Sequence, residues 1–303
     1  MQGTPKIIVF GKNGFLGSYL YRFYRNQENT YFVYKSKENT LVVLQRDKPT
    51  IELHWSNEAL LSIVHELEPD VLINAIALIS AEQCEANPLL AKHTNAEIPA
   101  VLASAASHVG ARMVQISTDA VFGQQGSNFT EEDEPRPISI YGKTKLQGER
   151  SVIELAPKNL IVRTNFYGHH QYKQTLFDYF YANLLLGQSV KGFGDIVFNP
   201  VYVKDLVFGI QKFIEVGVQG ILHFVGDEVL SKYDFGNKIS LQMGPHDGRL
   251  TSQKFRDLEP MAHRKLDLTL SSRTRKSIYQ SVFDIDLGIR DAILNAKVDK
   301  SEL

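Results

Sequence analysis

The sequence predicts an α/β protein built on a doubly wound parallel sheet. Short apolar runs suited to strands recur at roughly 30-residue intervals, and amphipathic helical patterns separate them. The first run, residues 6–10, passes directly into Gly11, Gly14 and Gly17, which have Gly-x-x-Gly-x-x-Gly spacing and precede a helical pattern. Strands that alternate with helices in this way are typical of a parallel sheet with helices on both faces.

The first half of the chain supplies most of the predicted sheet. Strands are expected at residues 6–10, 30–34, 71–73, 112–116 and 160–162, with an additional hairpin at 41–44 and 51–53. Helices are expected at 18–26, at 57–66, in two pieces between 86 and 109 that separate near Pro99, and from Ser139 to Ala156. Gly142 and Gly148 weaken the last of these helices, which is tolerable where a helix packs closely on a cofactor.

The second half mixes strands and helices less regularly. Helices are expected at 175–186, 204–216 and 232–243, a strand at 221–224, and a final strand and two helices up to Ala296. We therefore predict a nucleotide-binding domain at 1–164, to which parts of 195–225 return. A smaller α/β lobe, mainly 165–303 on the C-terminal side, is predicted to bind the substrate.

Composition narrows the class of protein. The chain has 303 residues, of which 43% are hydrophobic and 22% charged, and its formal net charge is −1. These values are ordinary for a soluble globular protein and give no electrostatic reason to expect nucleic acid or a membrane surface as a partner. One cysteine, Cys84, excludes an intrachain disulfide and a multi-cysteine metal site. The chain enters a strand at once, so we expect no signal peptide and a cytoplasmic location.

The three glycines indicate a nucleotide site. A turn between a strand and a helix can bring its backbone close to a pyrophosphate where side chains are absent, and the helix N-terminus then offers free N–H groups. A purely structural turn is the alternative for an isolated triplet, but the position after the first strand of an alternating chain favours nucleotide binding. The predicted cofactor-binding residues of this turn are Gly11, Asn13, Gly14, Phe15, Leu16 and Gly17.

Two further strand ends complete the predicted cofactor site. Lys35, Ser36 and Lys37 stand where an acidic residue would bind the ribose 2′-hydroxyl of NAD(H). Basic and hydroxyl groups suit a 2′-phosphate instead, which favours NADP(H) over NAD(H), although two lysines are also typical of a solvated loop. Small residues after the strand at 71–73 would let a flat cofactor approach the backbone, and the predicted contacts there are Asn74, Ala75, Ile76 and Ala77.

Tyr141 and Lys145 are the candidate catalytic pair. Four residues apart at the start of a helix, they lie on one face, about 6 Å apart along its axis. An ammonium group there favours the charged form of a phenol whose ordinary pKa is about 10, which makes the phenol a usable general acid near neutral pH. A hydroxyl from Ser117 or Thr118 could hold a carbonyl oxygen beside it. Without the nucleotide site upstream, a solvated helical pair would be the simpler interpretation.

Several strings resemble a known family over nearly the whole chain. They are FGKNGFLG, PDVLINAIA, ISTDAVF, PISIYGKTKLQGE, VRTNFYG, NPVYVKDL and HRKLDLTLSSRTRKSI. The chain resembles an extended short-chain dehydrogenase/reductase, and more narrowly the dTDP-4-dehydrorhamnose reductase family. The resemblance implies a Rossmann-like fold and NADPH-dependent reduction of the C4 keto group of a nucleotide-linked 4-keto-6-deoxysugar, in polysaccharide biosynthesis. It is also compatible with a homodimer.

The resemblance implies a role for each matching residue. Tyr141 would protonate the C4 oxygen, and Lys145 would lower the tyrosine pKa and bind the nicotinamide ribose. Thr118 would hydrogen-bond the carbonyl, with Ser117 as the alternative. The glycines would hold the pyrophosphate, and the small residues at 74–77 would line the adenosine-side channel. The predicted substrate-binding residues are Ser117, Thr118, Asn165, Phe166, Asn199 and Arg264, the last of which is equally well explained as a surface residue.

Departures from related enzymes refine this expectation. Related 4,6-dehydratases carry Asp-Glu after the threonine, whereas Asp119-Ala120 stands here, which favours reduction over dehydration. Ala120 and Phe166 replace an aromatic residue and a tryptophan that reductases of this branch often carry. The resemblance therefore does not specify which sugar is reduced. Tyr19 replaces a glutamate with which some relatives share a metal at a dimer interface, so we expect no such metal.

Two other functions stay open at this point. One is a nucleotide-sugar epimerase that retains NAD(P), and the other is a non-catalytic regulatory subunit, as in a relative of these reductases that regulates methionine adenosyltransferase. The remaining charged or imidazole-bearing features are expected on the surface. They are His169-His170, the acidic run at 131–134, and Arg273, Arg275 and Lys276.

Overall fold

The computed structural model describes residues 4–258 and 265–301. Close contacts divide the chain into two compact units. Unit 1 comprises Met1–Val121, Pro137–Arg163 and Ile210–Leu222, and unit 2 comprises Phe122–Arg136, Thr164–Gly209 and His223–Leu303. The domain bounds of 1–164 and mainly 165–303 that the sequence suggests remain a prediction.

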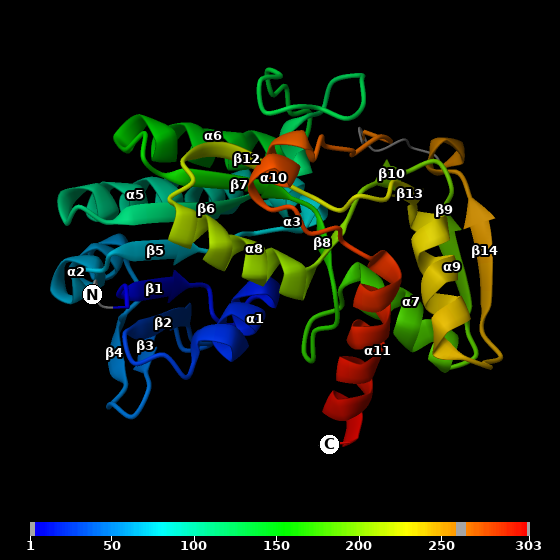
Figure 1. Cartoon of the computed structure of the whole chain (residues 1–303), viewed down its shortest axis with the longest axis horizontal. Helices are drawn as coiled ribbons and strands as arrows, with labels where there is room; N and C mark the ends of the chain where they lie inside the picture. The colour runs from blue at the N-terminus through cyan, green and yellow to red at the C-terminus, as the bar shows by residue number, and fades with distance from the viewer. Residues whose placement is uncertain (1–3, 259–264, 302–303) are drawn as a thin grey trace. The chain divides into compact units, whose positions relative to one another are not determined.

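Unit 1 is organised around one sheet (Figure 1). Within residues 4–258, eight strands pair in the order β12-β7-β6-β5-β1-β2-β3-β4. Their bounds are β1 Ile7–Phe10, β2 Thr30–Lys35, β3 Thr40–Gln45, β4 Ile51–His54, β5 Val71–Asn74, β6 Arg112–Thr118, β7 Leu160–Thr164 and β12 Gly220–Phe224. β2, β1, β5 and β6 run parallel, and the expected hairpin, β3–β4, continues the sheet antiparallel beyond β2. The doubly wound, Rossmann-like prediction is confirmed.

The strand order decides where a ligand can bind. From β1 the chain first builds outward through β2 to β4, then returns to pair β5 with the other side of β1. The order therefore reverses between β1 and β5, and ligands of such sheets bind at this point, beyond the carboxyl ends of the strands. Gly11 follows β1, Ala75 follows β5 and Thr118 ends β6, so all three stand at the same edge.

Helices cover both faces of this sheet. Their bounds are α1 Phe15–Tyr24, α2 Asn57–Leu67, α3 Ala81–Ala86, α4 Pro88–Lys92, α5 Ile98–His108, α6 Ile140–Leu155 and α8 Val203–Val216. On one face a buried apolar cluster joins Phe10 of β1 to Leu60 of α2 and Leu102 of α5. On the other, Tyr24 of α1 hydrogen-bonds Gln211 in the part of α8 that belongs to unit 1. Burial of both strand faces explains why these strands are continuous apolar runs.

The helical region predicted at 86–109 breaks earlier than expected. α3 ends at Ala86, the φ of −136° and ψ of 71° of the next residue, Asn87, are not helical, and Pro88 begins α4. A π-helical turn, His93–Glu97, joins α4 to α5, and Pro99 lies in the first turn of α5. The wider π turn accommodates a ring that would otherwise clash with the preceding helical turn, so Pro99 does not separate two helices.

Unit 2 combines short strand pairs with helices (Figure 1). The strands are β8 Phe166–Tyr167, β9 Ser189–Phe193, β10 Val197–Phe198, β11 Val201–Tyr202, β13 Leu230–Ser231 and β14 Arg249–Gln253. The helices are α7 Leu176–Leu185, α9 Lys232–Met243, α10 Arg273–Ile278 and α11 Ile285–Ser301. β9 and β14 pair in parallel, and α9 packs against both. Capping boxes start α7 and α9, because Thr175 and Ser231 each exchange hydrogen bonds with an aspartate three residues later.

Two predictions of surface exposure in unit 2 are wrong. Arg275 has no exposed surface, stacks on the Phe283 ring and pairs with Asp227 at 2.5 Å. The His169 side chain is only 13% exposed, and its Nδ1 lies 2.5 Å from Asp178 Oδ1. Unit 2 supplies a carboxylate partner for each of these side chains, and the burial of a polar group requires such a partner.

Candidate active site

The glycine turn has no room for side chains at two of its positions. Gly11 has a φ of 93°, and a Cβ there would lie 2.9 Å from the Ala75 carbonyl carbon. A Cβ on Gly17 would lie 1.9 Å from the Gly11 oxygen, so neither position accepts a side chain. α1 begins at Phe15 with Gly14 as N-cap and no side-chain cap hydrogen bond. No side chain therefore competes with a ligand at this end of α1, and pyrophosphate binding here stays a prediction.

The other residues predicted for this turn differ in how far their side chains are exposed. Asn13 is exposed and its Oδ1 lies 3.5 Å from Lys12 Nζ, whereas the Leu16 side chain is buried at 4% exposure. Leu16 can therefore offer a ligand only its backbone.

The segment after β5 stands beside the glycine turn. The Ala75 N–H donates to the Phe10 carbonyl, and Ile76 N–H donates to Asn74 Oδ1. The Asn74 amide is fully buried and donates to Gln115 Oε1 at 2.8 Å, so it holds strand ends together. Ala75, Ile76 and Ala77 are partly exposed, and their contact with a cofactor stays a prediction.

Two predicted lysines, Lys35 and Lys37, stand at the end of β2, and a third, Lys12, lies in the glycine turn. Lys35 Nζ lies over the Trp55 ring at 5.5 Å, and the Ser36 hydroxyl accepts from the N–H groups of Glu38 and Thr40. Lys37 lies in the turn that follows. Lys12, in the glycine turn, lies with Nζ 4.5 Å from the Tyr21 ring centre and 5.1 Å from the Tyr34 ring centre. Burial lowers the pKa of the Lys12 ammonium.

The predicted catalytic pair lies beside the end of β6. Ser139 caps α6 by accepting from Gly142 N–H, so Tyr141 and Lys145 occupy the first two turns of the helix. Lys145 is 3% exposed, and its ammonium donates to the Ile116 carbonyl at 2.7 Å. The Thr118 hydroxyl, 7% exposed, donates to Asp119 Oδ1 and also interacts with the Tyr141 phenol. The structure thus brings Thr118, Tyr141 and Lys145 together.

The electrostatics of this pair differ from the prediction. Burial raises the pKa of the Tyr141 phenol, and the hydrogen bond with Thr118 only partly opposes this. Burial also lowers the pKa of Lys145 to about 8, although the Glu149 carboxylate favours its charged form. The ammonium is directed to the Ile116 carbonyl and is itself desolvated, and burial decides the direction in which the pKa of Tyr141 shifts. Tyr141 is a protonated phenol at neutral pH.

The two glycines of α6 serve close packing within unit 1. A Cβ on Gly142 would lie 2.2 Å from the Ala120 oxygen, and one on Gly148 would lie 2.3 Å from the Asn95 oxygen. Asn95 is buried, and its amide bonds the Leu78 backbone and the Thr144 hydroxyl. The glycines therefore let α6 approach other backbone, rather than the cofactor that the sequence suggested.

A buried ion pair beside Lys145 was missed by the sequence prediction. Glu149 and Arg163 are 2% and 1% exposed, and Arg163 donates from Nε and Nη2 to both carboxylate oxygens at 2.8–3.2 Å. The Ser117 hydroxyl donates to Glu149 Oε1. Ser117 is thus engaged away from a substrate, and Thr118 remains the hydroxyl beside Tyr141. The spacing Tyr-x-x-x-Lys-x-x-x-Glu in α6 was the available signal.

The predicted substrate residues of unit 2 have mixed surroundings. The Asn199 amide is buried, donates to the Leu270 carbonyl at 2.8 Å and accepts from Leu270 N–H, so it has a structural role. The Asn165 carbonyl accepts from Val201 N–H, and Phe166 is half-buried at the start of β8. Arg264 lies outside the described residues. These assignments stay predictions.

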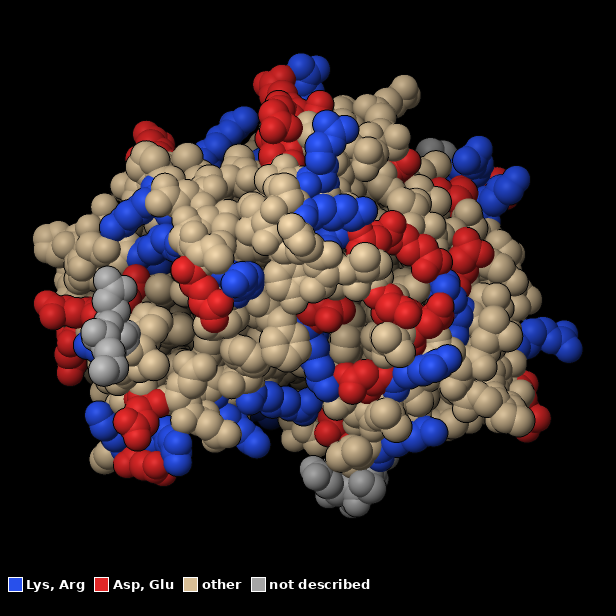
Figure 2. Space-filling model, viewed as in Figure 1, with Lys and Arg blue, Asp and Glu red and all other residues tan. Residues whose placement is uncertain are grey.

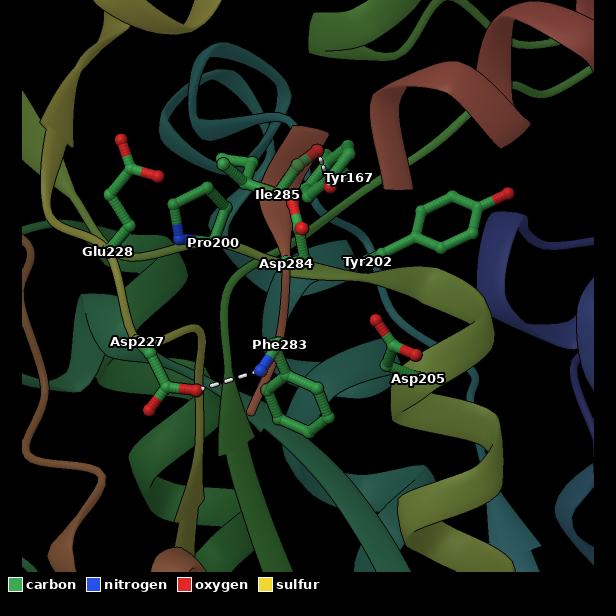
Figure 3. A pocket seen from close by; sticks show the side chains of 9 residues that line it. All are labelled: Tyr167, Pro200, Tyr202, Asp205, Asp227, Glu228, Phe283, Asp284 and Ile285. Atoms are coloured by element: carbon green, nitrogen blue, oxygen red, sulfur yellow. Dashed lines mark hydrogen bonds between the residues drawn. The ribbon is translucent and has the colours of Figure 1, made fainter. Parts of the chain in front are cut away.

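A pocket in unit 2 carries carboxylates that have local partners (Figure 3). It is lined by Tyr167, Pro200, Tyr202, Asp205, Asp227, Glu228, Phe283, Asp284 and Ile285. Asp227 accepts from Phe283 N–H and pairs with Arg275, and Asp284 caps α11. Asp205 differs, because burial and the nearby Asp291 raise its pKa to about 6. We assign the pocket no catalytic role.

Replacing Asp205 with asparagine is expected to stabilise the protein above neutral pH. Its folded pKa of about 6 exceeds the ordinary value of 3.8, so the fold loses stability as pH rises through about 6. Near pH 8, the free energy of unfolding of D205N is expected to be about 1–3 kcal/mol higher than that of the unmodified chain. Near pH 4 this difference should vanish. Urea denaturation at both pH values measures this. The exposed control D257N should change neither value, and a gain for D205N that persists at pH 4 would contradict the explanation.

Other site classes have little support in the described residues. No group of three His, Cys, Asp or Glu side chains among them is arranged to hold a metal ion. In the same residues, no helix has both the length and the apolar character to span a membrane. Figure 2 shows Lys and Arg interspersed with Asp and Glu on the visible face.

Comparison with known proteins places the chain in a family. The model of the family described as "RmlD substrate binding domain" matches residues 5–284. The chain is 30% identical over 267 residues to a probable low-salt glycan biosynthesis reductase, Agl14, of Haloferax volcanii, covering 84% of this chain and 86% of that protein. It is 25% identical over 247 residues to methionine adenosyltransferase 2 subunit beta of Rattus norvegicus, covering 78% and 72%.

Solved structures agree with this assignment. A dTDP-4-dehydrorhamnose reductase of Bacillus anthracis in complex with NADP superposes with a TM-score of 0.80 at 25% identity, covering 96% of this chain and 99% of that one. The match therefore extends over both units. The chain belongs to the RmlD substrate binding domain family.

Proposed function

We propose that the protein is an NADPH-dependent reductase of a nucleotide-linked 4-keto-6-deoxysugar, acting in nucleotide-sugar and polysaccharide biosynthesis. The observation that carries this proposal is the grouping of Thr118, Tyr141 and Lys145 in the unit that also holds the glycine turn. Named reductases among the relatives support the reaction class, and the similar structure with NADP supports the cofactor. NAD(H) is the second choice of cofactor.

The residues of unit 1 fit a dinucleotide. A Cβ would fill the space at Gly11 and Gly17, and the start of α1 has no side-chain cap. The pyrophosphate would lie on this turn, and the 2′-phosphate would lie near Lys12 and Lys35 at the end of β2. Ala75, Ile76 and Ala77 would contact the adenosine side. When bound, NADPH supplies the hydride.

The proton of the reduction comes from the chain. Reduction of a ketone adds a hydride to carbon and a proton to oxygen, and Tyr141 would donate that proton from its phenol. Because burial raises its pKa, Tyr141 is protonated before the reaction, and developing negative charge on the ketone oxygen drives the transfer. Thr118 would hold the same oxygen. The ammonium of Lys145 would stabilise the phenolate that remains and bind the nicotinamide ribose.

The residue after Asp119 separates this reaction from dehydration. Eliminating water from a neighbouring carbon requires a second acid–base group, and Ala120 cannot supply one. Its backbone oxygen instead lies against Gly142 at the start of α6. Simple reduction is therefore the reaction that these side chains support.

Purified protein tests the proposal directly. We expect NADPH oxidation, followed by absorbance, with dTDP-linked 4-keto-6-deoxysugars among a panel that also varies the nucleotide and the sugar configuration. Absence of oxidation with every member would remove the reaction assignment. Tightly retained NAD(P) that turns over without net oxidation would favour an epimerase instead.

A regulatory subunit is the second candidate, because one relative is named as a methionine adenosyltransferase subunit. Co-purification of a stoichiometric enzyme partner, together with no turnover of the isolated chain, would favour it. The presence of Thr118, Tyr141 and Lys145 in one cluster favours the reductase. A homodimer and a cytoplasmic location stay predictions, which gel filtration and cell fractionation can check.

Neutralising Lys12 is expected to reduce the preference for NADPH. In K12Q the affinity for NADPH should fall about tenfold, as expected for loss of one charge-assisted phosphate contact, while NADH affinity should change little. Fluorescence titration with each cofactor measures the two values. K48Q, a substitution of an exposed lysine in the β3–β4 turn, is the control. Equal losses for both cofactors would place Lys12 away from the 2′-phosphate.

A further inference from the structure

We infer that Glu149 is a positioning residue of the reductase site, and that its carboxylate, held by Arg163, keeps Lys145 charged and fixes β6 against α6. This inference rests on the proposed function, because it assigns a role in the same site. Neither residue touches the reacting atoms in this arrangement. Their effect would pass through Lys145 and through the end of β6.

Three consecutive residues of β6 contact three residues of α6. The Ile116 carbonyl accepts from Lys145 Nζ, the Ser117 hydroxyl donates to Glu149, and the Thr118 hydroxyl meets the Tyr141 phenol. Tyr141, Lys145 and Glu149 are spaced by four residues, so they follow one another along a single helix face. A shift of α6 by one turn would break all three contacts. Glu149 therefore helps to set the position of Thr118 relative to Tyr141.

Both oxygens of the Glu149 carboxylate accept hydrogen bonds from charged or polar side chains. Arg163 of β7 donates to both of its oxygens, and Ser117 donates to one of them. Both members of the ion pair are almost completely buried. These hydrogen bonds fix the position of the carboxylate, one helical turn from Lys145.

That fixed charge acts on the ammonium that the reaction needs. Desolvation alone would drive Lys145 towards its neutral form, and the Glu149 charge opposes this, which leaves the pKa of Lys145 at about 8. The other ionisable groups of this cluster are Tyr141 on α6, Asp119 after β6, Arg163 on β7 and Cys84 on α3. Glu149 is the neighbour whose charge raises the Lys145 pKa.

The test is the pH dependence of E149Q. In the unmodified protein, NADPH affinity and turnover should both fall as pH rises through about 8, where Lys145 loses its proton. In E149Q the midpoint of this fall should move to lower pH by at least about one unit, because an opposite charge nearby shifts a pKa by roughly 1–3 units. At a pH about two units below the E149Q midpoint, where Lys145 is charged in both proteins, the two should be within about threefold of each other. A purely structural role would lower both quantities equally at every pH, and that result would overturn the inference.

Matched variants keep the test decisive. E154Q removes the same charge from an exposed position of α6 and should leave the midpoint unchanged. E149D retains the charge and should keep the midpoint of the unmodified protein; a midpoint equal to that of E149Q would overturn the inference. If E149Q fails to fold, E149Q/R163Q replaces it, since no unpaired charge is then buried, and the same shift to lower pH is expected.

NADPH titration separates this inference from the proposed function. Affinity for NADPH is measured without a sugar substrate, so its pH midpoint reports on Lys145 even if no nucleotide sugar is reduced. A shifted midpoint without turnover would remove the proposed substrate and leave the role of Glu149 intact. Turnover in which E149Q and the unmodified protein have superimposable pH profiles would remove the role of Glu149 and leave the proposed substrate intact.

Discussion

Replacing Tyr141 with phenylalanine is expected to lower kcat for the NADPH-dependent reduction by about 10²–10⁴-fold, the usual contribution of a positioned general acid. The substitution removes only the phenol oxygen, so the ring still fills its place on α6 beside Thr118. Because burial keeps Tyr141 protonated at neutral pH, the loss should be similar across the neutral range. Single-turnover measurement of NADPH oxidation gives the rate of the chemical step.

Cofactor binding is the control for this variant. Y141F should bind NADPH within about threefold of the unmodified protein, since the glycine turn and the end of β2 are untouched. Y172F, which changes a tyrosine that is 81% exposed, should retain full activity. A Y141F rate within tenfold of the original would mean that another group, or water, delivers the proton.

The periodic features of the sequence predicted the fold because they act locally. Apolar runs, glycines at a strand end and a cap at Ser139 each determine structure within a few residues, and the structure contains the sheet and α6 accordingly. The same reasoning located Tyr141 and Lys145, since a spacing of four places two side chains on one helix face. The same reasoning did not predict the surroundings of the two side chains, because these depend on how deeply each side chain is buried.

The features that were missed depend on partners distant in sequence. Arg275 reads as a solvated residue until Asp227, 48 positions away, supplies the carboxylate that lets it be buried. Glu149 has no local signal of burial until β7 brings Arg163 against it, and Ser117 appears free for substrate until its hydroxyl donates a hydrogen bond to Glu149. Pairings across the fold decide whether a polar residue is buried, and no local pattern records them.

Breaking the Glu149–Arg163 pair from the arginine side is expected to destabilise the fold strongly. R163M retains the length and apolar packing of the side chain but leaves Glu149 buried with no positive partner at 2.8 Å. Removing one member of a buried pair costs about 3–5 kcal/mol in the free energy of unfolding, because an uncompensated charge remains. Urea denaturation followed by tryptophan fluorescence and circular dichroism measures the change.

The double variant E149L/R163M distinguishes desolvation from packing. With no buried charge left, it should regain most of the stability that R163M loses, because apolar residues can replace a buried ion pair at little net cost. R136M, which breaks an exposed pair with Glu134, should change the unfolding free energy by less than about 1 kcal/mol. If the double variant remained as unstable as R163M, the loss would come from packing between α6 and β7. In that case the ion pair would not be the dominant interaction that holds the helix carrying Tyr141 and Lys145 against the sheet.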